Sequence, residues 1–163
     1  MIRFVFILLL LPLSLLGQNT VCFEIEENPN PSIDALTLFP KYVNVLDCIH
    51  IYAEQSISDE KVLHAAAIAA ELLDNNEDGI IDDENVKNAL MDLYTVMPLF
   101  AYEGSNAEEI LFDNFDDLMD NNNFCAGAVL YNNEIDPSSP GFWGNDASVE
   151  EVLHTINACS HVE

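Results

Sequence analysis

The chain has 163 residues, of which 29 are acidic and only 4 are lysine or arginine, so its formal net charge at pH 7 is −25. Such a chain repels nucleic acid and anionic lipid surfaces and attracts cations; we therefore expect no nucleic-acid partner and expect Ca2+ as a ligand. Hydrophobic residues make up 50% of the chain, and its length suits one domain with a core of its own.

The N-terminal segment predicts a secretory signal peptide. Arg3 supplies a positive charge, and the apolar run 4–16 is too short to span a bilayer comfortably. Gly17 is the small residue that cleavage requires, so we predict a signal peptide over 1–17 and a single secreted domain over 18–163. The alternative is an uncleaved membrane anchor. After cleavage we expect no stable membrane association, because no later segment is apolar enough to span a bilayer.

Four cysteines lie in the predicted mature chain, an even number that is typical of disulfides in secreted proteins. Two disulfides are expected, and all connectivities are open. The shortest loops favour pairing Cys22 with Cys48 and Cys125 with Cys159. No pair has CxxC spacing, which argues against a zinc knuckle or a thioredoxin-type redox site.

Strand and helix patterns are interspersed along the chain, which predicts an α+β domain that is rich in helix and has short strands. Two Ser-x-x-Glu patterns, at Ser105 and at Ser148, predict capping boxes at helix starts. Acidic residues on one face of the helix after Ser105 are interpreted as a solvated surface, because no glycine is placed to form a second cation loop. In chain order we expect a strand at 21–25, a strand or strand pair at 42–52, a helix from Ser58, an acidic loop, a helix ending before Pro98, a strand at 99–102, a helix from Ser105, a strand at 128–131 and a last helix from Ser148.

The acidic loop 74–85 is the most specific pattern in the chain. Asp74, Asn76 and Asp78 stand two residues apart, which lets alternate side chains point at one ion. Gly79 follows where the loop must turn back, because glycine adopts positive φ without steric cost. Calcium takes six to eight oxygen ligands, so this arrangement favours a calcium site.

The second half of the loop supplies further oxygens. The carbonyl of Ile80 would point at the ion, Asp82 would bind directly or through a water, and Ile81 would turn into the core. Asn85 stands at the last ligand position, where one neutral amide oxygen binds calcium more weakly than a bidentate carboxylate. Glu84, one residue earlier, is the alternative ligand.

This loop resembles that of an EF-hand, and apolar faces on both sides predict the helix-loop-helix 58–97. No second loop is present to pair with it, so we expect a structural clamp at extracellular calcium and not a sensor. The alternative is an ordinary Asp/Asn/Gly turn followed by the acidic start of a helix. The resemblance implies calcium ligation by Asp74, Asn76, Asp78, Ile80, Asp82 and Asn85.

A second, looser resemblance concerns Glu-Glu-Val-Leu-His at 150–154. It is similar to the HExxH helix of zincin metalloproteases with the first histidine replaced by Glu150. The resemblance implies zinc as a cofactor, with Glu150, His154 and His161 as ligands and Glu151 as the general base. The alternative is an ordinary capped helix start with an exposed histidine, since the segment 58–64 has almost the same sequence.

Three functions follow from these patterns. The favoured one is a secreted protein in which calcium clamps a helix-loop-helix, so an enzyme is not the first expectation. The alternative is a zincin-like metallopeptidase or a degenerate relative that uses Glu150, Glu151 and His154. The third is an acidic interaction module that needs no metal. His64 forms a similar polar stripe with Glu60 and Glu71 and is not favoured as a site.

Overall fold

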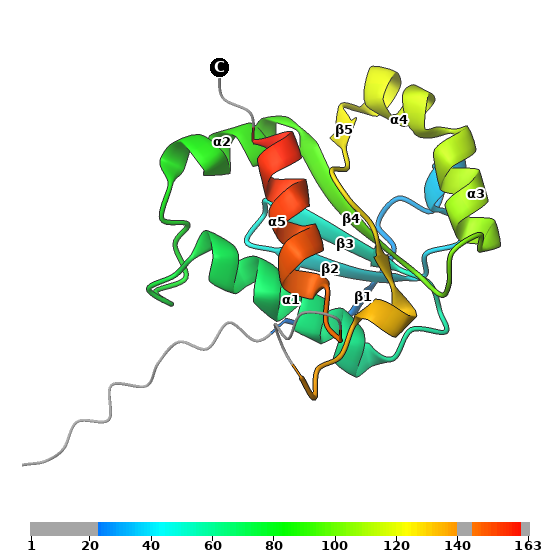
Figure 1. The fold of residues 1–163 in the computed structure, drawn as a ribbon. Coiled ribbons are helices and arrows are strands. Elements are labelled where there is room, and N and C mark those ends of the chain that lie inside the picture. The colour runs from blue at the N-terminus through cyan, green and yellow to red at the C-terminus, as the bar shows by residue number, and fades with distance from the viewer. Residues whose placement is uncertain (1–22, 140–144, 161–163) are drawn as a thin grey trace, which may run out of the picture.

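In the computed structural model, residues 23–139 and 145–160 are described, and they form an α+β domain with helices on both faces of a mixed sheet (Figure 1). This confirms the predicted fold class. The predicted signal peptide, Cys22 and His161 lie outside the described residues. Within them, no helix is long and apolar enough to cross a membrane.

The sheet has the order β1-β2-β3-β4, and both β5 and β6 pair with the far edge of β4. Strand β2 runs antiparallel to both β1 and β3, whereas β4 is parallel to β3, β5 and β6. The strands are β1 (Glu26–Glu27), β2 (Lys41–Val45), β3 (Ile49–Ala53), β4 (Tyr94–Phe100), β5 (Phe124–Cys125) and β6 (Leu130–Tyr131).

Two groups of helices cover the sheet. Helices α1 and α5 pack together on one face, and α3 and the short 3-10 helix η1 pack on the other (Figure 1). The helices are α1 (Asp59–Leu73), α2 (Glu84–Asp92), α3 (Asn106–Asp113), α4 (Phe115–Asn122) and α5 (Ser148–Cys159), with 3-10 turns η1 (Asp34–Leu36) and η2 (Asn132–Glu134).

The alternation of side chains along β2 and β3 divides the core into two clusters. Val43 and Ile51 are fully buried against α1 and α5, whereas Tyr42 and Tyr52 point to the opposite face and pack near η1. Successive side chains of a strand point to opposite faces, so this one hairpin supplies both layers. The predicted strand pair over 42–52 is therefore present.

His50 belongs to an aromatic stack that crosses β2, β3 and β4. Its ring is parallel to that of Tyr94 at a centroid distance of 3.9 Å, and its Nδ1 lies 2.7 Å from the hydroxyl of Tyr42. Burial disfavours the charged imidazole and lowers the pKa of His50 to about 4. His50 is thus a neutral packing group at pH 7.

The helix predicted to run to residue 97 ends at Asp92, and Tyr94–Phe100 is the central strand β4. The helical spacing of apolar residues there was misleading, because a strand that is buried on both faces is apolar at every position. Six of its seven residues, from Thr95 to Phe100 with Pro98 among them, are buried.

Two further expectations were wrong in detail. The first strand among the described residues is Glu26–Glu27, and 23–25 are not in a strand; the helix after Ser105 is broken into α3 and α4 at Asn114. Ser105 does accept a hydrogen bond from the backbone N–H of Glu108, as a helix cap should. Of the two expected disulfides, Cys125–Cys159 is present. Cys48 is a buried free thiol, and its expected partner Cys22 lies outside the described residues.

Candidate metal-binding sites

The acidic loop connects α1 to α2, as the helix-loop-helix pattern predicted. Its first residue, Asp74, is only 5% exposed, and its carboxylate accepts hydrogen bonds from the N–H groups of Gly79 at 2.6 Å and Asp78 at 3.2 Å. Gly79 has φ of +84°, the left-handed conformation that was expected of a glycine at this position. The loop backbone therefore folds back over the Asp74 side chain.

Asp82 closes the loop from the other side. Its carboxylate accepts from the Asn75 N–H at 2.9 Å and from the Asn76 side-chain amide at 2.8 Å. The backbone N–H of Asp82 also donates to the Leu73 carbonyl at 2.9 Å, which ties the loop to the end of α1. Ile81, between Ile80 and Asp82, is 7% exposed and belongs to the core cluster of α1 and α5.

The end of the loop differs from a complete cage of ligands. Asp83 caps α2 by accepting hydrogen bonds from the N–H groups of Asn85 and Val86, so Asn85 lies exposed in the first helical turn. Asp74, Asp78 and Asp82 do not bring three carboxylate oxygens within 4.8 Å of one another. The positive φ of Gly79 and the burial of Ile81 agree with the prediction, whereas the oxygen groups of the loop would have to draw together around an ion.

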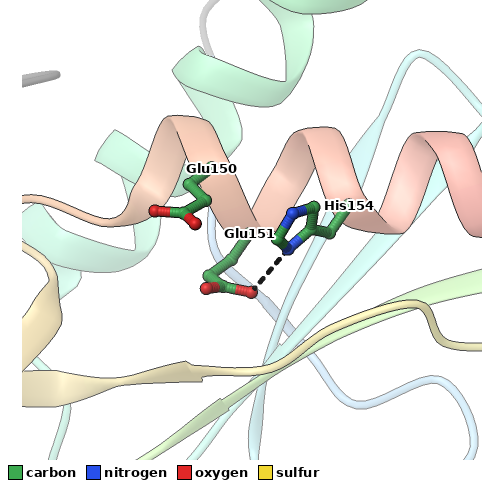
Figure 2. Close-up of side chains that lie close together, drawn as sticks. All are labelled: Glu150, Glu151 and His154. Carbon is green, nitrogen blue, oxygen red and sulfur yellow. Dashed lines mark hydrogen bonds and ion pairs between the residues drawn. The ribbon is translucent and has the colours of Figure 1, made fainter.

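The last helix gives the second constellation. Among the described residues, Glu150, Glu151 and His154 are the one group of three acidic, histidine or cysteine side chains whose ligand atoms lie within 4.8 Å of one another. Figure 2 shows these side chains near one another along α5, with His154 Nδ1 3.4 Å from Glu151 Oε2. They line a cleft of about 720 Å³ that also contains Glu134 and Asp146.

This arrangement does not separate the expected zinc ligands, Glu150 and His154, from the expected general base, Glu151. Glu151, the proposed base, is the residue in contact with His154, and the His154 side chain is 56% exposed. Two carboxylates and one imidazole form a mixed oxygen and nitrogen donor set that suits zinc and related divalent ions. His161, the third expected ligand, lies outside the described residues.

The sequence reasoning missed Asp146, the buried acid beside this cleft. Its carboxylate accepts hydrogen bonds from Ser148 Oγ at 2.7 Å and the Ser148 N–H at 3.3 Å, and it pairs with His64 Nε2 at 2.8 Å. Ser148 is consequently inside α5 and does not cap it, so the predicted capping box with Glu151 is absent. The sequence does contain a signal for this contact, because Asp146 stands two residues before Ser148 and aspartate is a good helix-capping residue.

Comparisons of the chain with protein-family models, with curated proteins and with solved structures find no match. The two candidate sites differ in their chemistry: the loop at Asp74 offers oxygen ligands alone, and the cluster at His154 adds an imidazole nitrogen.

Proposed function

We propose that this protein is a secreted calcium-binding domain in which Ca2+ at the loop 74–85 clamps α1 to α2. The observation that carries the proposal is the environment of the Asp74 carboxylate. It is nearly buried at the C-terminal end of α1, where the helix dipole is negative and the last turn has no basic residue. Among the described residues, no lysine, arginine or histidine forms an ion pair with Asp74. A bound cation would supply the missing positive charge.

The ligands follow from the loop. The side chains of Asp74, Asp78 and Asp82 would supply carboxylate oxygens, the Ile80 carbonyl would face the ion, and Asn85 would be the weak last ligand. The chain charge of −25 raises the local concentration of cations. We expect a dissociation constant on the order of 10⁻⁴–10⁻³ M, which suits an extracellular protein with a constitutively filled site.

Asn76 has to change partner when calcium binds. Its side-chain N–H group donates to Asp82 Oδ1, and a rotation of the amide would turn its oxygen toward the ion in place of the nitrogen. The Asp82 carboxylate would therefore accept a hydrogen bond from Asn76 without calcium and bind the cation when calcium is present.

Calcium is expected to stabilise the protein against heat. At about 10 mM Ca2+ and the affinity given above, binding to the native state should add roughly 1.5–2.5 kcal/mol to the free energy of unfolding, a rise of several degrees in Tm. The measurement is calorimetric titration of chelator-treated protein with Ca2+, followed by thermal melts with calcium and with chelator.

The variant Asp78→Asn should remove most of this calcium-dependent shift, because it replaces a carboxylate ligand by an amide. Asp116→Asn is the matched control: it makes the same change of charge on the exposed surface of α4 and should keep the full shift. A melting temperature that is equal with calcium and with chelator would overturn the proposal, as would an unchanged shift in Asp78→Asn.

A second candidate, a zincin-like metal-dependent hydrolase, is favoured by the close approach of Glu150, Glu151 and His154. Here we expect zinc, but not calcium, to bind at this cluster. His154→Ala should weaken zinc binding at least tenfold, because the cluster loses its one nitrogen ligand among the described residues. Zinc titration with Asn157→Ala as a control on the same helix measures this. Equal zinc affinity in the two variants would eliminate the candidate.

A further inference from the structure

The outer edge of the sheet contains a gap between β5 and β6. The register pairs Thr95 with Cys125 and Leu99 with Leu130, so the three residues 96–98 face the four residues 126–129. Pro98 is one of the residues opposite this segment, and it has no N–H group to donate to it. The segment 126–129 therefore lies outside the ladder, between the paired residues of β5 and β6.

This segment is held in place by α5. A Cβ atom on Gly127 would lie 2.6 Å from Thr155 Cα and 2.8 Å from the His154 carbonyl oxygen, so only glycine allows so close an approach. Residues 126–129 belong to neither β5 nor β6, and Gly127 is exposed. The segment is thus fixed against α5, and its backbone at Gly127 is open to a ligand.

A groove of about 380 Å³ runs along this edge and receives side chains from both faces of the sheet. From α3 and the start of α4 come Phe112, which is 53% exposed, and Phe115. From α5 on the opposite face come Glu151 and His154, which Figure 2 shows side by side on the helix. One wall is therefore aromatic and the other is acidic.

We propose that this groove binds an extended cationic peptide segment, which pairs with 126–129 as an added strand. Successive side chains of a strand point to opposite faces. A basic side chain of the peptide would then meet Glu151, and the next side chain, an apolar one, would meet Phe112. The groove accordingly selects alternating basic and apolar residues. This binding does not depend on calcium at the loop 74–85.

The negative charge of the groove determines that the bound peptide must be positively charged. Glu151 lies beside Glu150 on α5, and the surrounding chain carries a net charge of −25, so an acidic peptide would be repelled. The same field attracts any cationic peptide without regard to its sequence. Selectivity for the alternating pattern is what separates a strand-binding groove from general attraction.

The test uses the full chain at a fixed calcium concentration and acetylated, amidated peptides about six residues long, enough to cover the segment. The first peptide alternates lysine and leucine; the second has the same composition with the lysines and the leucines in separate blocks. A third alternates lysine and leucine with a central proline, which cannot complete a ladder. We expect saturable binding of the first peptide and at least tenfold weaker binding of the other two, measured by fluorescence anisotropy.

Two variants locate the site. Glu151→Gln should weaken binding of the alternating peptide about threefold to tenfold through loss of one partly exposed charge pair, and Phe112→Ser should weaken it by loss of the aromatic wall. Glu109→Gln, on the exposed surface of α3, is the matched charge control and should bind like the parent chain. Equal affinity for the alternating and the block peptide, or an equal loss in Glu109→Gln and Glu151→Gln, would overturn the proposal.

Discussion

Removal of the Cys125–Cys159 disulfide is expected to lower the free energy of unfolding by about 4 kcal/mol, the largest effect of any change considered for this protein. The bond closes a loop with a sequence separation of 34 and joins β5, at the sheet edge, to the last residue of α5. Without it, the unfolded chain gains the freedom that this loop closure removes.

The measurement is urea unfolding of the double variant Cys125→Ala, Cys159→Ala beside the parent chain. Cys48→Ala is the control, because Cys48 is a buried free thiol that closes no loop. Burial raises the pKa of the Cys48 thiol to about 11, so it should also resist alkylation in the folded protein. A Cys48→Ala cost that equals or exceeds that of the double variant would contradict the loop-closure argument.

Truncation of Asp146 to alanine is expected to cost about 3 kcal/mol, because it leaves buried hydrogen-bond donors without an acceptor. Asp146 is 5% exposed and connects α1, through His64, to the start of α5, through Ser148. The hydroxyl of Ser148 is itself fully buried and would lose its acceptor. Asp146→Asn should cost less, since the amide oxygen can still accept from Ser148.

Chemical denaturation of Asp146→Ala, with Asp113→Ala on the exposed surface of α3 as a control, measures this cost. His64→Gln and the double variant complete a mutant cycle that isolates the contact between His64 and Asp146. Additive losses in the cycle would show that the two side chains are not coupled. A cost in Asp146→Ala no greater than in the control would contradict the proposed role of the buried carboxylate.

The sequence was most informative where a local pattern has one structural solution. The alternation over 42–52 became the β2–β3 hairpin, and the spacing of Val62, Ala66 and Ala69 became the buried face of α1. Gly79 adopts positive φ and Ile81 turns into the core, as the loop pattern required. These features depend on backbone sterics and on side-chain period, which neighbours in sequence largely decide.

The candidate sites were only partly predictable. The short spacing of Glu150, Glu151 and His154 on one helix was enough to bring them together. Asp146 is far from His64 in sequence, and Gly127 is far from α5. No local sequence pattern therefore predicts the contact between Asp146 and His64 or the contact between Gly127 and α5. The groove along 126–129 exists only because two distant helices flank one sheet edge.

By itself, the sequence determined the α+β class, the acidic charge, the hairpin, the ends of α1 and the conformation of the acidic loop, because each depends on composition or on a short stretch of chain. Only the tertiary structure decided that Tyr94–Phe100 is a strand. Burial on both faces removes the alternation that would mark it, and pairing with β3 provides the backbone hydrogen bonds. The tertiary structure also decided that Cys48 is free and that Asp146, not Ser148, accepts the hydrogen bonds at the start of α5. The pairing of Asp146 with His64 depends on how α1 and α5 pack together, which the spacing of residues along the chain does not contain.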